Sequence, residues 1–187
     1  RMFAARKGQD DLIKKGHAQY RLETFDKALP LYLDAARFKL KGRLAPDALL
    51  YAAICAYKSD RLLEAIAIAD FMSERHPKSK KTHDALFNVA TICRVHARKV
   101  KKTNPELGHR LTGYAAYLMG RFVKRAPDHP NAAAAAWAMA ETQFSRGQEL
   151  TKKKKELIKA GAPKSEVNAM ILKIRAKYLR AVPLYEV

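Results

Sequence analysis

The chain has few of the residues that interrupt helices. Its 187 residues include only eight glycines and eight prolines, and these fall mostly between stretches with helical periodicity. That distribution leaves little room for a sheet and predicts an all-α fold. There are two cysteines, Cys55 and Cys93, and both lie in apolar helical stretches. We expect buried free thiols, with a disulfide between two helices as the alternative.

Long apolar segments are also missing. No apolar run approaches the ~20 residues that a membrane-spanning helix needs, and no signal peptide is visible. Because the chain begins at Arg1 and ends inside an amphipathic stretch at Val187, we expect it to be a piece of a longer protein. The missing targeting signals therefore decide nothing about its compartment.

Acidic residues are scarce relative to basic ones. There are 18 Asp and Glu against 37 Lys and Arg, which gives a formal net charge of +19. The excess is spread along the chain, and only residues 47–81 are close to neutral. Such a surface favours acidic partners: nucleic acid, anionic lipid, an acidic protein or an anionic polymer. The alternative is a protein from a basic proteome or intracellular niche, in which the charge has no partner.

An internal repeat is the strongest positive signal. Residues 72–90 and 122–140 both show the end of a helix, a proline and the start of a new helix in the same register. The matched pairs are Arg75 with Arg125, Pro77 with Pro127, Ala85 with Ala135, and Ala90 with Ala140. Recurrence at this period is typical of a helical repeat array, which more often binds than catalyses.

The first repeat carries the most specific pattern. It combines a helix from Leu12 to Leu22, a break at Glu23–Thr24 and a second helix from Phe25. The string from Gly16 through Ala28 and Tyr32 to Ala35 resembles a tetratricopeptide repeat. In that family a small residue of the first helix (helix A) faces a small residue of the second (helix B), and an aromatic side chain fills the gap beside them. The physics agrees, because two helices approach closely only where both present small side chains.

The resemblance implies a right-handed α-solenoid of about four such repeats, at about 9–41, 46–78, 82–128 and 131–187, forming a single domain over residues 1–187. The small residues expected in the four helices A are Gly16, Ala53, Ala90 and Ala140. The third and fourth repeats are lengthened. Their helices A should run to stops at Thr103-Asn104-Pro105 and at Gly161-Ala162-Pro163, with Gly161 as a helix cap.

A groove is expected on the concave face, which helices A line in the resembled family. Aromatic side chains interleaved with cations there suit a peptide with acidic and apolar side chains. The alternative is that several aromatics merely pack between helices. The terminal-carboxylate clamp of some family members is not supported, because its positions hold His17, Ile54, Thr91 and Glu141. The predicted groove residues are Ile13, His17, Tyr20, Arg21, Leu50, Ile54, Tyr57, Lys58, Phe87, Arg94, Trp137 and Phe144.

Lysines gather near the two lengthened tips. They could form one basic edge that attracts phosphates or an anionic surface, with affinity that falls as salt rises. The alternative is a solvated helix surface, and the absence of stacking aromatics among them weakens a single-strand nucleic-acid role. The basic-edge residues are Lys99, Lys101, Lys102, Lys152, Lys153, Lys154, Lys155, Lys159 and Lys164.

Catalytic and metal-binding patterns are weak. Cys93 and His96 are three apart on one helix, but no second pair of ligands is evident, so we expect no metal and no cofactor. No nucleophile triad, glycine-rich phosphate loop or carboxylate pair stands out, so we expect no enzyme.

The function expected is a non-catalytic scaffold that holds a partner protein or peptide. The alternatives are a module for nucleic acid or an anionic polymer, and a structural spacer. The linkers around Pro77 and Pro127 are similar to those of repeats in bacterial envelope proteins, including outer-membrane assembly lipoproteins and periplasmic cell-division coordinators. That similarity implies a bacterial source, with an envelope scaffold as one possibility. The net charge of +19 and the free cysteines fit a cytoplasmic setting at least as well.

Overall fold

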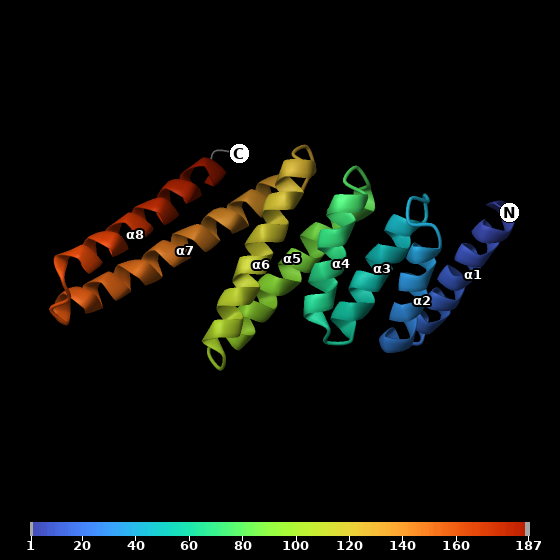
Figure 1. The fold of residues 1–187 in the computed structure, drawn as a ribbon, viewed down its shortest axis with the longest axis horizontal. Coiled ribbons are helices and arrows are strands. Elements are labelled where there is room, and N and C mark those ends of the chain that lie inside the picture. The colour runs from blue at the N-terminus through green and yellow to red at the C-terminus, as the bar shows by residue number, and fades with distance from the viewer. Residues whose placement is uncertain (1, 186–187) are drawn as a thin grey trace. The chain divides into compact units, whose positions relative to one another are not determined.

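In a computed structural model the backbone is described for residues 2–185 and the side chains for residues 8–180. The described backbone is helical with short turns and contains no strand, which confirms the all-α prediction (Figure 1). Its eight helices are α1 (Met2–Arg21), α2 (Phe25–Phe38), α3 (Ala45–Lys58), α4 (Leu62–Arg75), α5 (Lys80–Val100), α6 (Pro105–Arg125), α7 (Ala132–Lys159) and α8 (Lys164–Tyr185). Within residues 2–185 no helix is long and apolar enough to cross a membrane.

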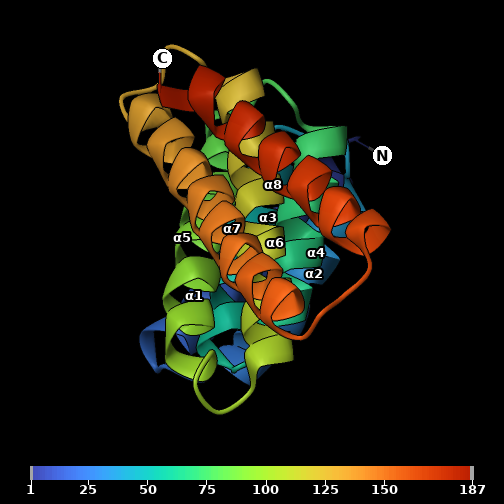
Figure 2. The same ribbon diagram turned by 90° about the vertical axis from the view of Figure 1, so that its left-hand side faces the viewer.

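The chain divides into two compact units. The N-terminal unit, residues 1–126, contains α1 to α6, and the C-terminal unit, residues 127–187, contains α7 and α8. In the N-terminal unit each helix packs on the next, with further contacts between α3 and α5 and between α4 and α6. In the C-terminal unit α7 and α8 run antiparallel along each other, as both ribbon views show (Figure 2). This sequential packing fits a helical repeat in general terms. That all four repeats form one domain stays a prediction.

The helix boundaries agree with most of the predicted stops. Helix α2 begins at Phe25 as expected, and α5 ends at Val100, before the Thr103-Asn104-Pro105 stop. There the side chain of Asn104 accepts a hydrogen bond from the backbone N–H of Leu107 at 3.0 Å. The predicted start of the first helix at Leu12 is wrong, because α1 already begins at Met2. Residues 2–11 contain no proline, so nothing in them stops the helix.

Three of the four helices predicted as helices A, namely α1, α3 and α7, end in the same Schellman motif. The residue after the C-cap has a left-handed backbone in each case: Glu23 after α1 (φ 55°), Asp60 after α3 (φ 57°) and Gly161 after α7 (φ 70°). After α7, Gly161 donates to Ile158 and Ala162 donates to Leu157, which is the hydrogen-bond pair of this motif. The prediction of Gly161 as the capping glycine is therefore confirmed.

These left-handed positions lead to a paired prediction on stability. Glu23→Gly should raise the free energy of unfolding by about 0.5–1 kcal/mol, because a side chain is strained in this region and glycine is not. Gly161→Ala should lower it by about 1 kcal/mol, although nothing lies within 4 Å of the added methyl group. Urea denaturation measures both. If the two variants shift stability in the same direction, the backbone explanation is wrong.

The close approach predicted for the first hairpin is present between Gly16 of α1 and Tyr32 of α2. A Cβ atom on Gly16 would lie 2.8 Å from Cε1 of Tyr32, so only glycine leaves room for the ring. Tyr32 and Ala28 are both fully buried. The spacing of small and aromatic residues thus located a close approach of α1 and α2.

The last hairpin repeats this contact at a different position from the one expected. A Cβ atom on Gly147 of α7 would lie 2.8 Å from Cε1 of Tyr178 of α8. The sequence assigned Ala140 to the place of Gly16 in this repeat, whereas Gly147 makes the contact. The two residues lie two helical turns apart on one face of α7, so sequence pattern alone allowed either register.

The later helices are longer, as the spacing of the repeats predicted. Helices α5 and α6 have 21 residues each, α7 has 28 and α8 has 22, whereas α2, α3 and α4 have 14. The 20 residues of α1 were not expected. Within this added segment Gly8 lies close to the end of α2, where a Cβ atom on Gly8 would lie 2.9 Å from the Phe38 ring.

Both cysteines are buried free thiols, as predicted. Burial raises the pKa of the Cys55 thiol to about 11 and that of Cys93 to about 12. Both thiols therefore stay protonated at neutral pH and behave as small core side chains.

Candidate interaction surfaces

A strip of aromatic and cationic side chains crosses the N-terminal unit. Its aromatic contacts connect different helices: the ring centroids of Tyr20 of α1 and Phe25 of α2 are 5.4 Å apart, and those of Tyr57 of α3 and His96 of α5 are 6.4 Å apart. The ammonium of Lys58 lies 5.9 Å from the centroid of Phe25. We call this surface the aromatic–cation strip and define it by Tyr20, Arg21, Phe25, Tyr57, Lys58 and His96.

The local structure explains how the strip arises. Arg21 and Lys58 are at the C-terminal ends of α1 and α3, where the partial negative charge of the helix favours cations. Both cations are exposed, while Tyr20 and Tyr57 are half-buried. Burial raises the pKa of Tyr20, and the neighbouring Cys55 and Tyr51 raise it further, so this phenol stays neutral. The strip thus offers hydroxyl donors, ring faces and positive charge.

Several predicted groove residues serve the packing of the helices instead. Leu50 is buried and therefore belongs to the core. The Nδ1 atom of His17 is 2.8 Å from the hydroxyl of Tyr32, and the ring of Phe87 packs on that of Phe122 at 5.4 Å. Ile13 and Ile54 are half-buried, as is Arg94. Tyr20, Arg21, Tyr57 and Lys58 thus remain candidate surface residues, whereas Leu50, His17 and Phe87 pack between helices.

The remaining two groove residues lie in the C-terminal unit. Trp137 and Phe144 of α7 are both exposed, and the Phe144 ring contacts that of Tyr178 with centroids 5.4 Å apart. That they belong to one groove with the residues of the N-terminal unit stays a prediction.

The basic-edge lysines are placed on surfaces, but they belong to different units. Lys99, Lys101 and Lys102 lie at the end of α5 and in the following turn, and all three are exposed. Lys152 to Lys155 and Lys159 are on α7, with Lys164 at the start of α8, and only Lys154 among these is half-buried. A single basic patch made from both groups stays a prediction.

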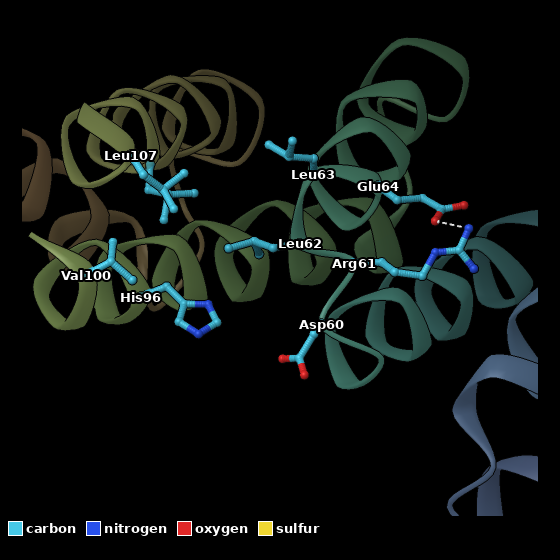
Figure 3. Close-up of a pocket in the computed structure, with 9 residues that line it drawn as sticks. Asp60, Arg61, Leu62, Leu63, Glu64, His96, Val100 and Leu107 are labelled. Carbon is cyan, nitrogen blue, oxygen red and sulfur yellow. Dashed lines mark ion pairs between the residues drawn. The ribbon is translucent and has the colours of Figure 1, made fainter. Parts of the chain in front are cut away.

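A groove that the sequence did not indicate lies between α4 and α6. It consists of two hollows of about 460 and 650 Å³ that share Leu63. Figure 3 shows the first, where Leu63 of α4 and Leu107 of α6 face each other across the opening. The second continues between Ile66 of α4 and Tyr114 of α6. We call this surface the α4–α6 groove. Its lining residues are Asp60, Arg61, Leu62, Leu63, Glu64, Ile66, Ala67, Asp70, His96, Val100, Leu107, Arg110, Leu111, Gly113, Tyr114 and Tyr117.

A polar cluster closes one end of the groove. The hydroxyl of Tyr117 donates to Oδ1 of Asp70 at 2.8 Å, and the guanidinium of Arg121 contacts both groups and also pairs with Glu74 at 3.6 Å. Burial raises the pKa of Tyr117, and its hydrogen bond to Asp70 raises it further. At the other end, Arg61 pairs with Glu64 at 2.6 Å (Figure 3).

The groove was missed because the expectation concerned the predicted helices A, whereas α4 and α6 take the positions predicted for helices B. The sequence contained one signal that could have indicated it. Leu62 and Leu63 are adjacent in α4, so their side chains point in different directions and cannot both lie on one face of the helix. Leu63 is 54% exposed.

No group of three or more metal-ligating side chains occurs among the described residues. Cys93 is fully buried, and the ring of His96 lies 6.4 Å from that of Tyr57.

Comparison with known proteins adds no family. No protein-family model and no curated protein sequence matches this chain.

Proposed function

We propose that the chain is a non-catalytic scaffold of tetratricopeptide-like repeats that holds a partner protein or peptide on the aromatic–cation strip. The observation that carries this proposal is the exposed ammonium of Lys58, which lies 5.9 Å from the centroid of the half-buried Phe25 ring. A second exposed cation, Arg21, follows the half-buried Tyr20 in sequence. The partner would carry carboxylates for Arg21 and Lys58 and apolar side chains for the rings.

The composition of the strip supports binding. Tyrosine and arginine are enriched where proteins bind one another, because they combine a large apolar area with a polar group. Rings held by neighbouring rings lose little conformational freedom when a partner binds, so more of the contact energy becomes affinity.

The basic lysines favour a second candidate, a module for an anionic polymer. Positive charge is dense in the C-terminal unit, where burial lowers the pKa of Lys177 and the neighbouring Arg146 and Arg180 lower it further. Binding of this kind loses affinity steeply as salt rises.

A displayed library of random peptides tests the first proposal. Selection on the whole chain should enrich peptides with acidic and aromatic or aliphatic residues. Tyr57→Ala and Lys58→Glu should each weaken binding of a selected peptide at least tenfold, an effect of about 1.4 kcal/mol. Replacing Lys152, Lys153 and Lys155 by Gln is the control and should change binding less than twofold.

The opposite pattern contradicts the proposal. If the lysine variant abolishes binding and Tyr57→Ala does not, the strip is not the site. The anionic-polymer candidate is then favoured, and binding of heparin or single-stranded DNA at two salt concentrations would measure it.

A further inference from the structure

Helix α7 carries exposed aromatic rings and exposed lysines on one face. The helix is continuous over its 28 residues (Figure 1). At 3.6 residues per turn, a second ring and three lysines lie within about 60° of Trp137 around the helix axis. Trp137 is 54% exposed and Phe144 is 43% exposed, and all three lysines are exposed. We call this surface the α7 stripe, and it consists of Trp137, Phe144, Lys152, Lys155 and Lys159.

The packing of α7 explains why the two rings are accessible. Ala133 and Ala134 lie about one turn before Trp137 on the same side of the helix, and both are exposed. Because these side chains are small, they leave much of the indole uncovered. The ring of Phe144 is supported from α8 by that of Tyr178, with the centroids 5.4 Å apart. Exposed rings of this size are more typical of a binding surface than of a core.

The positive charge of the α7 stripe is not compensated by nearby carboxylates. Within the described part of the chain its three lysines form no ion pair. Glu141 is the carboxylate on this face, but it is half-buried and already takes part in an interaction. Glu149 and Glu156 lie about 100–120° away from Trp137 around the axis. The lysines therefore remain available to an anionic ligand.

A single strand of nucleic acid matches this combination of rings and lysines. Proteins that bind single strands without sequence preference stack bases on aromatic rings and contact the backbone phosphates with cations. Heparin has the negative charge but no aromatic ring, and the bases of a duplex are already stacked on one another. From Trp137 to Lys159 the stripe is about 33 Å long at 1.5 Å per residue. This length suits about ten nucleotides at the 3.4 Å spacing of a stacked strand.

We propose that the α7 stripe binds single-stranded nucleic acid, with bases stacked on Trp137 and Phe144 and phosphates held by the three lysines. The inference rests on the second candidate function, the anionic-polymer module, and names its polymer. It is independent of the aromatic–cation strip. The sequence has no aromatic residue among these lysines, which weakened a single-strand role. The rings lie instead on the same helix face, with Phe144 about two turns before Lys152.

Trp137 is the single tryptophan of the chain, so its fluorescence reports directly on this surface. Titration of the whole chain with an oligothymidylate of about ten nucleotides should quench the indole emission about twofold or more, because a base stacks on the ring. Heparin should bind through the lysines and leave the emission nearly unchanged. Both ligands should dissociate as salt rises.

Variants of Trp137 separate stacking from charge. Fluorescence anisotropy of the labelled oligothymidylate measures their affinity. Trp137→Leu should weaken binding about tenfold, whereas Trp137→Phe keeps an aromatic ring and should lose less than about threefold. Neither variant should change the affinity for heparin. Because the indole is exposed, both variants should fold, which circular dichroism checks.

Lys153 and Lys155 provide a matched pair of charge changes. Both are exposed lysines of α7, but Lys153 lies about 160° from Trp137 around the axis, on the opposite side of the helix. Lys155→Gln should weaken binding of the oligothymidylate about threefold or more. It should also reduce the slope of log affinity against log salt by about 0.7, the value for one phosphate contact. Lys153→Gln should weaken binding less than about twofold.

The possible failures are distinguishable. If neither heparin nor the oligothymidylate binds at any salt concentration, the anionic-polymer module is wrong and this inference with it. If both bind, but without quenching and with full affinity in Trp137→Leu, the module stands and the inference is wrong. Equal losses for Lys153→Gln and Lys155→Gln would also overturn it, because the contact would then not follow one face of α7. Equal quenching by an oligoglutamate would assign the α7 stripe to acidic peptides instead.

Discussion

Replacing Tyr32 by alanine should lower the free energy of unfolding by about 3–5 kcal/mol, the usual cost of removing a fully buried aromatic ring. The side chain of Tyr32, on α2, is completely buried. Its ring stacks on that of Tyr51 of α3, with the ring centroids 5.2 Å apart and an interplanar angle of 17°. Gly16 leaves the space that the ring occupies. Alanine would leave a cavity there, because the helix backbones cannot close on it completely.

The phenol group accounts for a smaller part of this effect. Its oxygen is 2.8 Å from Nδ1 of His17, so Tyr32→Phe removes one hydrogen bond and keeps the ring. That variant should lose about 1 kcal/mol. Urea denaturation followed by circular dichroism measures both variants. A loss below about 1 kcal/mol for Tyr32→Ala would show that α1 and α2 can repack around a smaller side chain.

The contact between Gly16 and Tyr32 was predictable from sequence because it depends on spacing alone. A glycine in one helix, an alanine in the next and an aromatic residue four positions later together indicate that the two helices approach closely. The same reasoning placed the stops at Asn104 and Gly161, where the backbone needs a capping side chain or a left-handed residue.

The register of the last hairpin and the length of α1 were not predictable in this way. Ala140 and Gly147 are both small and share one face of α7, so only packing against Tyr178 decides between them. In the added part of α1, Gly8 lies close to Phe38, which is distant in sequence. Local patterns do not contain such contacts.

The candidate surfaces were predictable in part for a similar reason. Helical register alone was enough to select four surface candidates, because it gives the face of the helix on which each residue lies: Tyr20, Arg21, Tyr57 and Lys58. The difference between a ring that faces solvent and one that packs, as Phe87 does on Phe122, depends on the neighbouring helix. The α4–α6 groove exists because of the distance between α4 and α6. The pattern of side chains within one helix contains no information on that distance, so the groove could not be predicted from it.

Phe122 of α6 provides the second large effect, in the third hairpin. Its side chain is completely buried, and its ring centroid lies 5.4 Å from that of Phe87 of α5. Phe122→Ala should lower the free energy of unfolding by about 3–5 kcal/mol, since a ring of this size leaves a cavity that α5 and α6 cannot fill.

Two further variants separate ring packing from cavity formation. Phe122→Leu keeps most of the volume and should lose less than half as much stability as Phe122→Ala. Phe87→Ala removes the other ring of the pair, but Phe87 is only half-buried, so its loss should be smaller than that of Phe122→Ala. Urea denaturation of the three variants gives the order. If Phe87→Ala were the most damaging, the α5–α6 pair would depend on the ring of α5, and Phe122 would not be the centre of this part of the core.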